Sequence, residues 1–147
     1  MAIVREIALS TVISIILSCF ALPGMANAEQ VTNPTHQIVM EKSKFIRKSK
    51  SIRGDITVEE RDGQQVIVFS EDFKAKSGPD LKVFLSPHGV SSASGKNALS
   101  GAVRLGELKR TKGGQEYLIP QGVDLAGYDS VLVHCEAYSV LWGAAAI

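Results

Sequence analysis

The sequence predicts an all-β fold: a single antiparallel β-sandwich or barrel-like domain that follows an N-terminal signal peptide. Three observations support this prediction. Short apolar runs alternate with polar residues at a period of two, which is typical of half-buried strands. Turn signals rich in glycine, proline and aspartate separate these runs. Beyond the N-terminal apolar stretch, no segment keeps the spacing of an amphipathic helix over three turns.

Residues 1–28 have the pattern of a secretory signal peptide. Arg5 precedes an apolar stretch over residues 7–22, and the Ala-Asn-Ala of residues 26–28 forms an A-x-A cleavage site. We therefore expect cleavage after Ala28 and a periplasmic or secreted protein. No other segment approaches the roughly 20 apolar residues needed to span a bilayer, so we expect no retained transmembrane helix.

A second interpretation of the N-terminus is a lipoprotein signal, in which Cys19 carries the lipid. Leu17 precedes Ser18 at a position where such signals usually have a small residue, which favours the cleaved signal peptide. Residues 29–44 are then a polar leader. Residues 45–147 form the β domain, because the chain after the signal is one domain by size and long enough for its own core.

The charge of the chain excludes one class of partner. Removal of residues 1–28 takes away one basic and one acidic residue, so the net charge of +1 is unchanged. Nucleic-acid binding is not expected, because it needs a strongly basic face.

A basic cluster follows the leader, and it has two interpretations. It can attract an anionic membrane surface or partner, or it can be a solvated entry to the first strand. Phe45 and Ile46 interrupt the charges and Glu41 and Asp55 offset them, which favours the solvated entry. The cluster consists of Lys42, Lys44, Arg47, Lys48, Lys50 and Arg53.

The expected strands follow one another along the chain. Asp62-Gly63 lies between the runs 56–60 and 66–69 and is a strong hairpin signal. A Gly78-Pro79 turn leads into a strand over residues 81–86. Residues 89–101 are rich in serine, glycine and alanine, so we expect a mobile loop there. Alternation resumes over residues 103–108, 116–120, 131–137 and 139–142.

Cys135 is the best chemical clue, because it is the only cysteine left after cleavage. An unpaired thiol in an oxidising compartment must be buried, ligated or redox-active. Strand alternation places Cys135 on an apolar face. That face holds Val131, Val133, Cys135 and Ala137, and the other face holds Leu132, His134 and Glu136.

His134 and the nearby aromatic residues are expected to be structural. His134 points away from Cys135 on a regular strand, so we interpret it as a half-exposed strand histidine and expect no metal site. Tyr138 and Trp142 are four residues apart and are expected on one face, opposite Cys135 if the strand pairing is regular. His88 lies at the start of the loop, from which it could swing toward a site.

Hydrolytic chemistry is not indicated. The loop serines 91, 92, 94 and 100 have no Gly-x-Ser-x-Gly elbow and no acid–histidine arrangement. Asp72 and Asp80 stand at turns, where aspartate usually caps backbone amides. We expect no independent catalytic activity.

Seven segments together resemble the DM13 domain, a small extracellular β-domain that also occurs beside DOMON and cytochrome b561 modules. The segments are residues 54–58, 68–73, 77–85, 105–109, 114–120, 128–131 and 135–145. The resemblance implies a β-sandwich-like fold and a proposed electron-transfer role. It also implies that the family's cysteine, here Cys135, acts as a bare thiol or holds a prosthetic group such as haem. Where the family usually has a large aromatic residue, this chain has His134, a potential auxiliary ligand or proton carrier.

Two functions follow as hypotheses. The first is an exported redox or electron-transfer protein with Cys135 as its active thiol or cofactor ligand and with a redox partner protein. The second is a non-catalytic extracytoplasmic module that binds a protein or a surface, with Cys135 buried. A disulfide between two copies of Cys135 is a third arrangement, which the apolar face disfavours. A redox thiol reacts under native conditions, whereas a structural thiol reacts only after unfolding.

Overall fold

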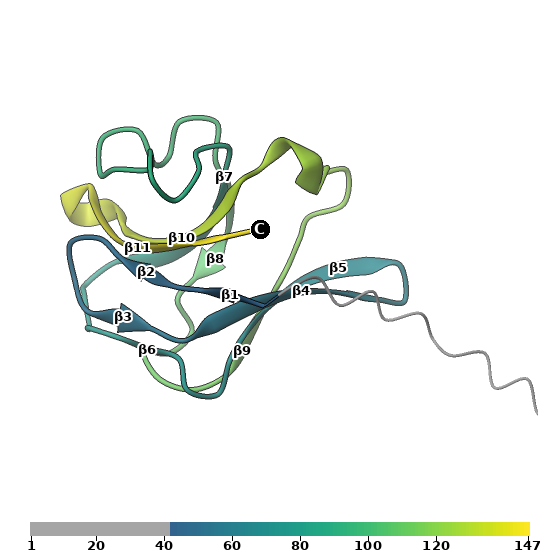
Figure 1. Ribbon diagram of the computed structural model, residues 1–147, viewed down its shortest axis with the longest axis horizontal. Coiled ribbons are helices and arrows are strands. Elements are labelled where there is room, and N and C mark those ends of the chain that lie inside the picture. Colours follow the sequence, from purple (N-terminus) through teal and green to yellow (C-terminus); the bar gives the residue numbers. More distant parts are fainter. Residues whose placement is uncertain (1–41) are drawn as a thin grey trace, which may run out of the picture. The chain divides into compact units, whose positions relative to one another are not determined.

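The computed structural model describes residues 42–147 as a sandwich of antiparallel sheets (Figure 1). This range contains eleven strands, two short 3-10 helices and no α-helix. The prediction of an all-β antiparallel domain is confirmed. The predicted signal peptide, Cys19 and most of the polar leader lie outside the described residues. Within residues 42–147, no helix is long and apolar enough to cross a membrane.

The two main sheets contain four and five strands. The four-stranded sheet has the order β1 (Ser43–Lys44), β4 (Asp55–Arg61), β5 (Gln64–Phe69) and β9 (Gln115–Leu118). The five-stranded sheet has the order β2 (Ile46–Arg47), β11 (Val140–Ala146), β10 (Ser130–Cys135), β7 (Leu81–Ser86) and β8 (Val103–Glu107). A small third sheet pairs β3 (Ile52–Arg53) with β6 (Lys74–Ala75). The 3-10 helices are η1 (Leu125–Gly127) and η2 (Glu136–Tyr138).

The predicted hairpin at Asp62-Gly63 joins β4 to β5. Both residues have positive φ, 52° and 75°, as the tight turns that suit the twist of paired strands require. Arg61 and Gln64 are the last paired residues before the turn.

The predicted basic entry segment is part of the fold. Residues 43–53 contribute β1, β2 and β3, one strand to each sheet. Phe45 lies between β1 and β2 and is buried. Most of the basic side chains of this segment remain exposed. The exposed charges agree with the interpretation of a solvated segment. The segment is not an entry that precedes the first strand, however, because apolar positions between the charges anchor it in the core.

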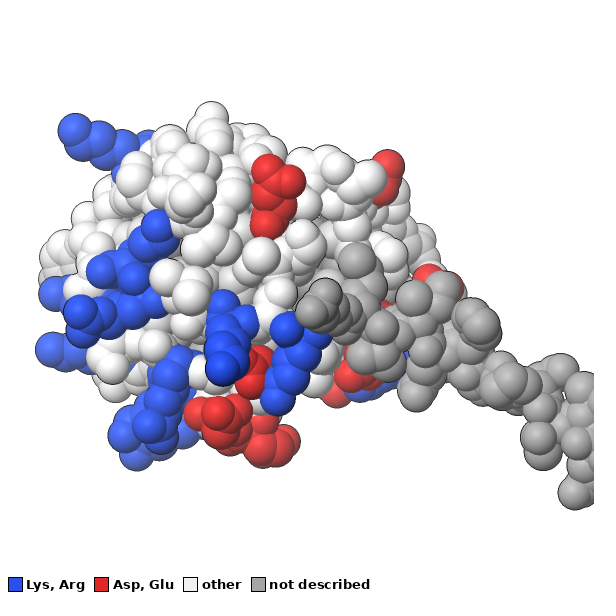
Figure 2. Space-filling model, viewed as in Figure 1, with Lys and Arg blue, Asp and Glu red and all other residues white. Residues whose placement is uncertain are grey.

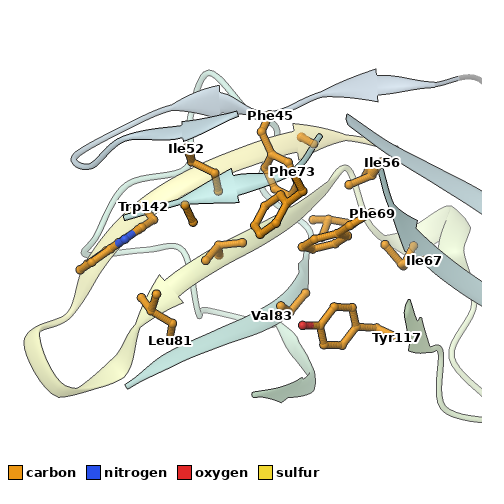
Figure 3. Packing of buried hydrophobic residues seen from close by; sticks show 14 of the residues in the cluster. Phe45, Ile52, Ile56, Ile67, Phe69, Phe73, Leu81, Val83, Tyr117 and Trp142 are labelled. Carbon is orange, nitrogen blue, oxygen red and sulfur yellow. The ribbon is translucent and has the colours of Figure 1, made fainter. Parts of the chain in front are cut away.

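Aromatic side chains fill the space between the two main sheets (Figure 3). Phe69 of β5 lies at the centre, with ring centroids 5.0 Å from Phe45, 4.8 Å from Phe73 and 5.2 Å from Tyr117. Its exposure is 1 %. Each contact joins Phe69 to a different part of the chain, so this ring links β5 to β9 and to the segments around β1 and β6.

The outer face of the five-stranded sheet is covered as well. Residues 89–102 pack on it and bury Ala93 and Ala98 against Phe84, Leu132 and Leu141. All residues of β7 and β10 are buried as a result. We expected a mobile loop in residues 89–101, but this segment is a packed cover. Its small residues allow close approach to the sheet.

We predict that Phe69→Ala lowers the free energy of unfolding by about 3–5 kcal/mol, because it removes a fully buried ring and leaves a cavity. Chemical denaturation monitored by Trp142 fluorescence measures this change. Leu118→Ala is the control, since Leu118 lies on neighbouring β9 and is 64 % exposed. Equal losses in the two variants would contradict the central role of Phe69.

Candidate functional site

Cys135 is the last residue of β10, and its thiol lies in the core between the sheets. Its Cα partners are Leu81 on β7 and Val140 on β11. Its exposure is 0 %, and it forms no disulfide. Val131 and Val133 share its core cluster, as strand alternation predicts. Ala137 does not, because β10 ends at Cys135 and Ala137 is an exposed residue of η2.

A β-bulge next to Cys135 changes the face of Trp142. The register shifts between Val133 and His134, whose partners on β11 are Gly143 and Leu141. Trp142 is therefore an extra residue on β11, and it packs in the same cluster as Cys135. The predicted face for Trp142 is wrong for this reason. Tyr138 does not share a strand with it, because it lies in η2 and is 68 % exposed.

Gly78 and Leu81 close the core around Trp142. The indole Nε1 donates a hydrogen bond of 2.7 Å to the carbonyl oxygen of Lys76. A Cβ added to Gly78 would lie 2.8 Å from Cζ2 of Trp142 and 3.1 Å from Cδ2 of Leu81. Gly78 thus allows the turn before β7 to lie directly on the two side chains. Since Leu81 is opposite Cys135, this packing also covers the end of β10.

His134 is buried, with an exposure of 1 %. It lies on the outer face of the sheet, edge-on to Phe84 with ring centroids 6.3 Å apart. The prediction of a half-exposed histidine is wrong, because residues 89–102 cover this face. Neither ring nitrogen has a hydrogen-bond partner among the described residues. Burial lowers the pKa of His134, while the backbone of Gly95 and the charge of Glu136 oppose the shift.

A group of charged side chains lies near His134 and Cys135, where the start of β7 pairs with the end of β10. Lys82 is the Cα partner of His134 and is only 8 % exposed. Its Nζ lies 2.7 Å from Oδ1 of Asp80 and also contacts Oε2 of Glu136. Hydrogen bonds to Asp80 and, to a smaller extent, to Glu136 raise the pKa of Lys82. The hydrogen bond from Lys82 lowers the pKa of Asp80. We call Asp80, Lys82 and Glu136 the carboxylate–lysine cluster.

This cluster was not predicted from the sequence. We expected Asp80 to cap a turn, and its main partner is instead Lys82. The sequence contained one local signal, the spacing of two between Asp80 and Lys82, whereas the approach of Glu136 depends on the pairing of β7 with β10. Asp72 accepts a 2.6 Å hydrogen bond from the side-chain hydroxyl of Ser70, two residues earlier in the chain.

The turn after Cys135 is held from two sides. Glu136 N donates a 3.1 Å hydrogen bond to the carbonyl oxygen of Asp80, which adds to the ion pair with Lys82. On the other side, a Cβ on Gly95 would lie 2.6 Å from the carbonyl oxygen of Ser139. Ser139 itself has φ 51°, a left-handed conformation that is costly for a residue with a side chain. The η2 turn is therefore a strained segment held closed by its neighbours.

The other residues considered from the sequence lie elsewhere. His88 follows β7, and its carbonyl oxygen accepts a 2.6 Å hydrogen bond from Ser130 Oγ, at the opposite end of β10 from Cys135. The loop serines belong to the packed cover. Ser94, for example, donates a hydrogen bond to Asn97.

The surroundings of Cys135 do not fit a haem. Hollows of about 410, 330 and 210 Å³ lie on the surface of the domain, and neither Cys135 nor His134 lines any of these three. Packed core side chains surround the thiol instead. Among residues 42–147, no three potential metal ligands of the His, Cys, Asp and Glu types lie close enough to hold an ion.

A family model described as "Electron transfer DM13" matches residues 44–147. The chain belongs to the DM13 family. This confirms the resemblance found in the sequence, and the family supports a redox role for the domain. Comparisons with curated proteins and with solved structures gave no significant match.

We predict that the buried His134 makes the domain acid-sensitive. The folded pKa is lowered, so the unfolded chain takes up a proton first as the pH falls below the ordinary value of 6.5. Stability should be present above this pH and should fall below it, by at most about 1.4 kcal/mol per pH unit for one proton. Denaturation at pH 7.5 and pH 5 measures this loss.

His134→Phe should remove this loss between pH 6.5 and 5, since it places an apolar ring beside Phe84. His134→Leu serves the same purpose if the larger ring overpacks the site. His88→Gln keeps His134 and should remain acid-sensitive. An unchanged pH profile in both His134 variants would assign the acid sensitivity to other groups.

Proposed function

We propose that this protein is an exported redox accessory protein in which Cys135, as a bare thiol, exchanges electrons with a partner protein. The signal-peptide pattern of residues 1–28 supports export. Membership of an electron-transfer family is the observation that carries the redox role. Cys135 is the only cysteine in the part of the chain that the structure describes, which makes it the candidate centre.

A thiol with 0 % exposure reacts only when its surroundings open. Cys135 is well placed for a local opening, because β10 ends at this residue and the strained η2 turn follows directly. Displacing η2 requires the Glu136–Lys82 ion pair to break, but it leaves the Phe69 packing intact. Local openings of this kind cost less than global unfolding.

The chemistry is thiol–disulfide exchange. In the open state, Cys135 loses its proton to solvent, and the thiolate attacks one sulfur of a disulfide on the partner. A new S–S bond forms to Cys135 as the partner's own S–S bond breaks, and the partner's second sulfur leaves as a thiolate. Cys135 is thereby oxidised and the leaving sulfur is reduced, so that electrons and atoms balance.

We predict that Cys135 reacts with an aromatic disulfide reagent through local opening. The rate should be slow, and it should be independent of denaturant at low concentrations, because little surface is exposed in the opening. Glu136→Gln should increase this rate about two- to fivefold by weakening the partly buried ion pair that holds η2. Release of the reagent's coloured thiolate measures the exchange, and Cys135→Ala gives the background.

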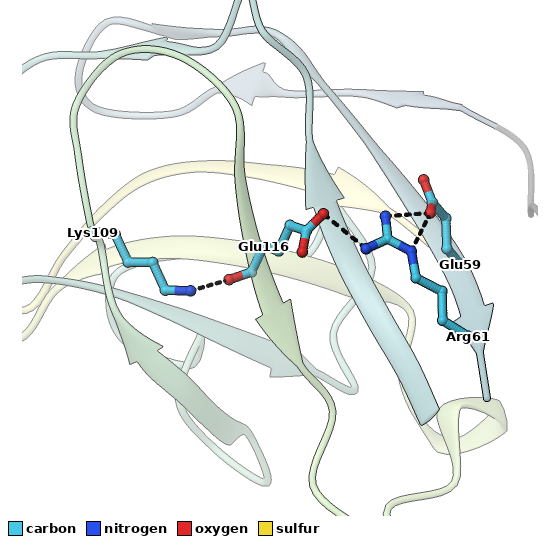
Figure 4. Close-up of polar contacts among 4 residues, drawn as sticks. All are labelled: Glu59, Arg61, Lys109 and Glu116. Carbon is cyan, nitrogen blue, oxygen red and sulfur yellow. Dashed lines mark hydrogen bonds and ion pairs between the residues drawn. The ribbon is translucent and has the colours of Figure 1, made fainter. Parts of the chain in front are cut away.

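Glu116→Gln is the matched control. It removes one carboxylate from an ion pair with Arg61, on the four-stranded sheet (Figure 4). Its labelling rate should equal that of the wild type. Labelling that occurs only with global unfolding, and that Glu136→Gln does not change, would overturn the redox role of Cys135.

A second function is a non-catalytic binding module with a structural Cys135. The observation that favours it is the complete burial of the thiol in a packed core. Under this function, Cys135→Ala changes only stability. The labelling experiment therefore separates the two functions.

A further inference from the structure

Three exposed cations form a row across short paired strands. Arg53 of β3 is directly opposite Lys74 of β6, and Lys74 in turn bridges to Lys112. All three side chains are exposed. Like charges at directly opposite strand positions destabilise a sheet. The row therefore has a cost in stability.

Two more cations lie on neighbouring segments, Lys76 just after β6 and Lys48 just after β2. Lys76 N donates to the carbonyl oxygen of Ser51 at 2.8 Å, and Lys48 N donates to that of Trp142 at 2.9 Å. Figure 2 shows basic side chains gathered over the region where Figure 1 places β2, β3 and β6. We call this surface the basic face. It consists of Lys48, Arg53, Lys74, Lys76 and Lys112.

The cations of the basic face form no ion pairs, a property that they share with other exposed cations of the described domain such as Lys44 and Arg110. What distinguishes the basic face is that Arg53, Lys74 and Lys112 occupy directly opposite backbone positions. Elsewhere, Arg61 pairs with Glu59 and Glu116, and Lys82 pairs with Asp80 and Glu136. None of the five cations of the basic face forms an ion pair within residues 42–147. Asp72 is near enough for Arg53 to lower its pKa, but its first partner is Ser70. The basic face therefore has charge available for an external partner.

The basic face adjoins the candidate redox site. Lys48 is hydrogen-bonded to the backbone of Trp142, and Lys76 accepts the hydrogen bond of its indole. Trp142 packs in the same cluster as Cys135. Ser49 N also donates a 3.1 Å hydrogen bond to the carbonyl oxygen of Leu141, next to the turn that follows Cys135. A partner seated on this face would lie beside the strand end that opens.

We propose that the basic face docks the acidic face of a partner protein and so selects the protein with which Cys135 exchanges electrons. The electron exchange between the docked partner and Cys135 rests on the proposed redox function, whereas the docking itself does not. Redox encounters commonly use small interfaces, and complementary charge increases their association rate. Since the chain has a net charge of only +1, attraction depends on this local grouping.

An acidic protein fits the basic face better than an anionic membrane does. Membrane-surface binding usually combines cations with apolar side chains that enter the lipid. The exposed large apolar residues of the described range are Ile46, Leu118 and Tyr138. Only Ile46, on β2, is near the basic face, and none lies in the row itself. The surface provides charge without an apolar anchor.

Binding to fluorescent poly-L-glutamate at low ionic strength tests the proposal. We expect the purified full-length protein to bind this acidic chain, and we expect added salt to weaken the binding. Lys74→Gln/Lys112→Gln should reduce the affinity about tenfold, on the scale of two lost exposed ion pairs. This variant should fold, because it removes repulsion. Fluorescence anisotropy measures the affinity.

Lys96→Gln/Arg104→Gln is the matched control, with the same change in net charge. Lys96 lies in the cover, and Arg104 lies on β8, at the opposite edge of the sheet from β2. Its affinity should change less than about twofold. Equal losses in both variants, or no binding by the wild type, would overturn the proposal. Binding to phosphatidylglycerol vesicles that requires the row, without row-dependent polyglutamate binding, would assign the face to membranes instead.

The outcome is independent of the redox chemistry. Cys135→Ser should bind polyglutamate as the wild type does, and the Lys74→Gln/Lys112→Gln variant should label at the wild-type rate. Row-dependent binding in a protein whose Cys135 labels only after global unfolding would retain the docking face and reject the thiol mechanism. Labelling of Cys135 through local opening, without row-dependent binding, would retain the thiol mechanism and reject the docking face.

Discussion

The packing of Phe69 between the two main sheets is the interaction on which the rest of the structure depends. Its contacts with Phe45, Phe73 and Tyr117 join segments that are far apart in the sequence. A buried aromatic ring contributes several kcal/mol, comparable with the whole stability of a small domain. The same packing excludes water from the inner face of β10. Burial of Cys135 is therefore a consequence of how the sandwich is held together.

Cys135 and His134 are neighbours in the chain, but the sheet separates their environments. Cys135 lies in the core between the sheets, and His134 lies beneath the outer cover. A ligand cannot use both side chains without displacing the strand, which is why a shared metal or haem does not fit. The environments of the two residues come together at the η2 turn. Both the carboxylate–lysine cluster and the cover contact that turn, so its opening depends on both layers.

The sequence predicted those features that depend on local geometry. Alternation identified the inner face of β10 up to Cys135, and Asp62-Gly63 identified the hairpin. The errors at His134 and Trp142 have non-local causes, namely a cover formed by residues 89–102 and a bulge set by strand pairing. A composition of serine, glycine and alanine is common to mobile loops and close-packed covers. The cluster around Lys82 was missed because Glu136 comes close to Lys82 only when β7 and β10 are paired, although Asp80 is just two residues before Lys82.

The small sheet of β3 and β6 explains how the domain tolerates a row of like charges. On its inner side, Ile52 is directly opposite Ala75, and both are only 6 % exposed. Burying an isoleucine contributes about 1.5–3 kcal/mol, whereas an exposed cross-strand charge pair costs about 0.2–1 kcal/mol. Gly143 adds to this anchoring, since a Cβ there would lie 2.5 Å from Cγ2 of Ile52. The hydrophobic side thus outweighs the repulsion on the exposed side. Packing fixes the backbone of this sheet, and its exposed side chains are free to serve a partner.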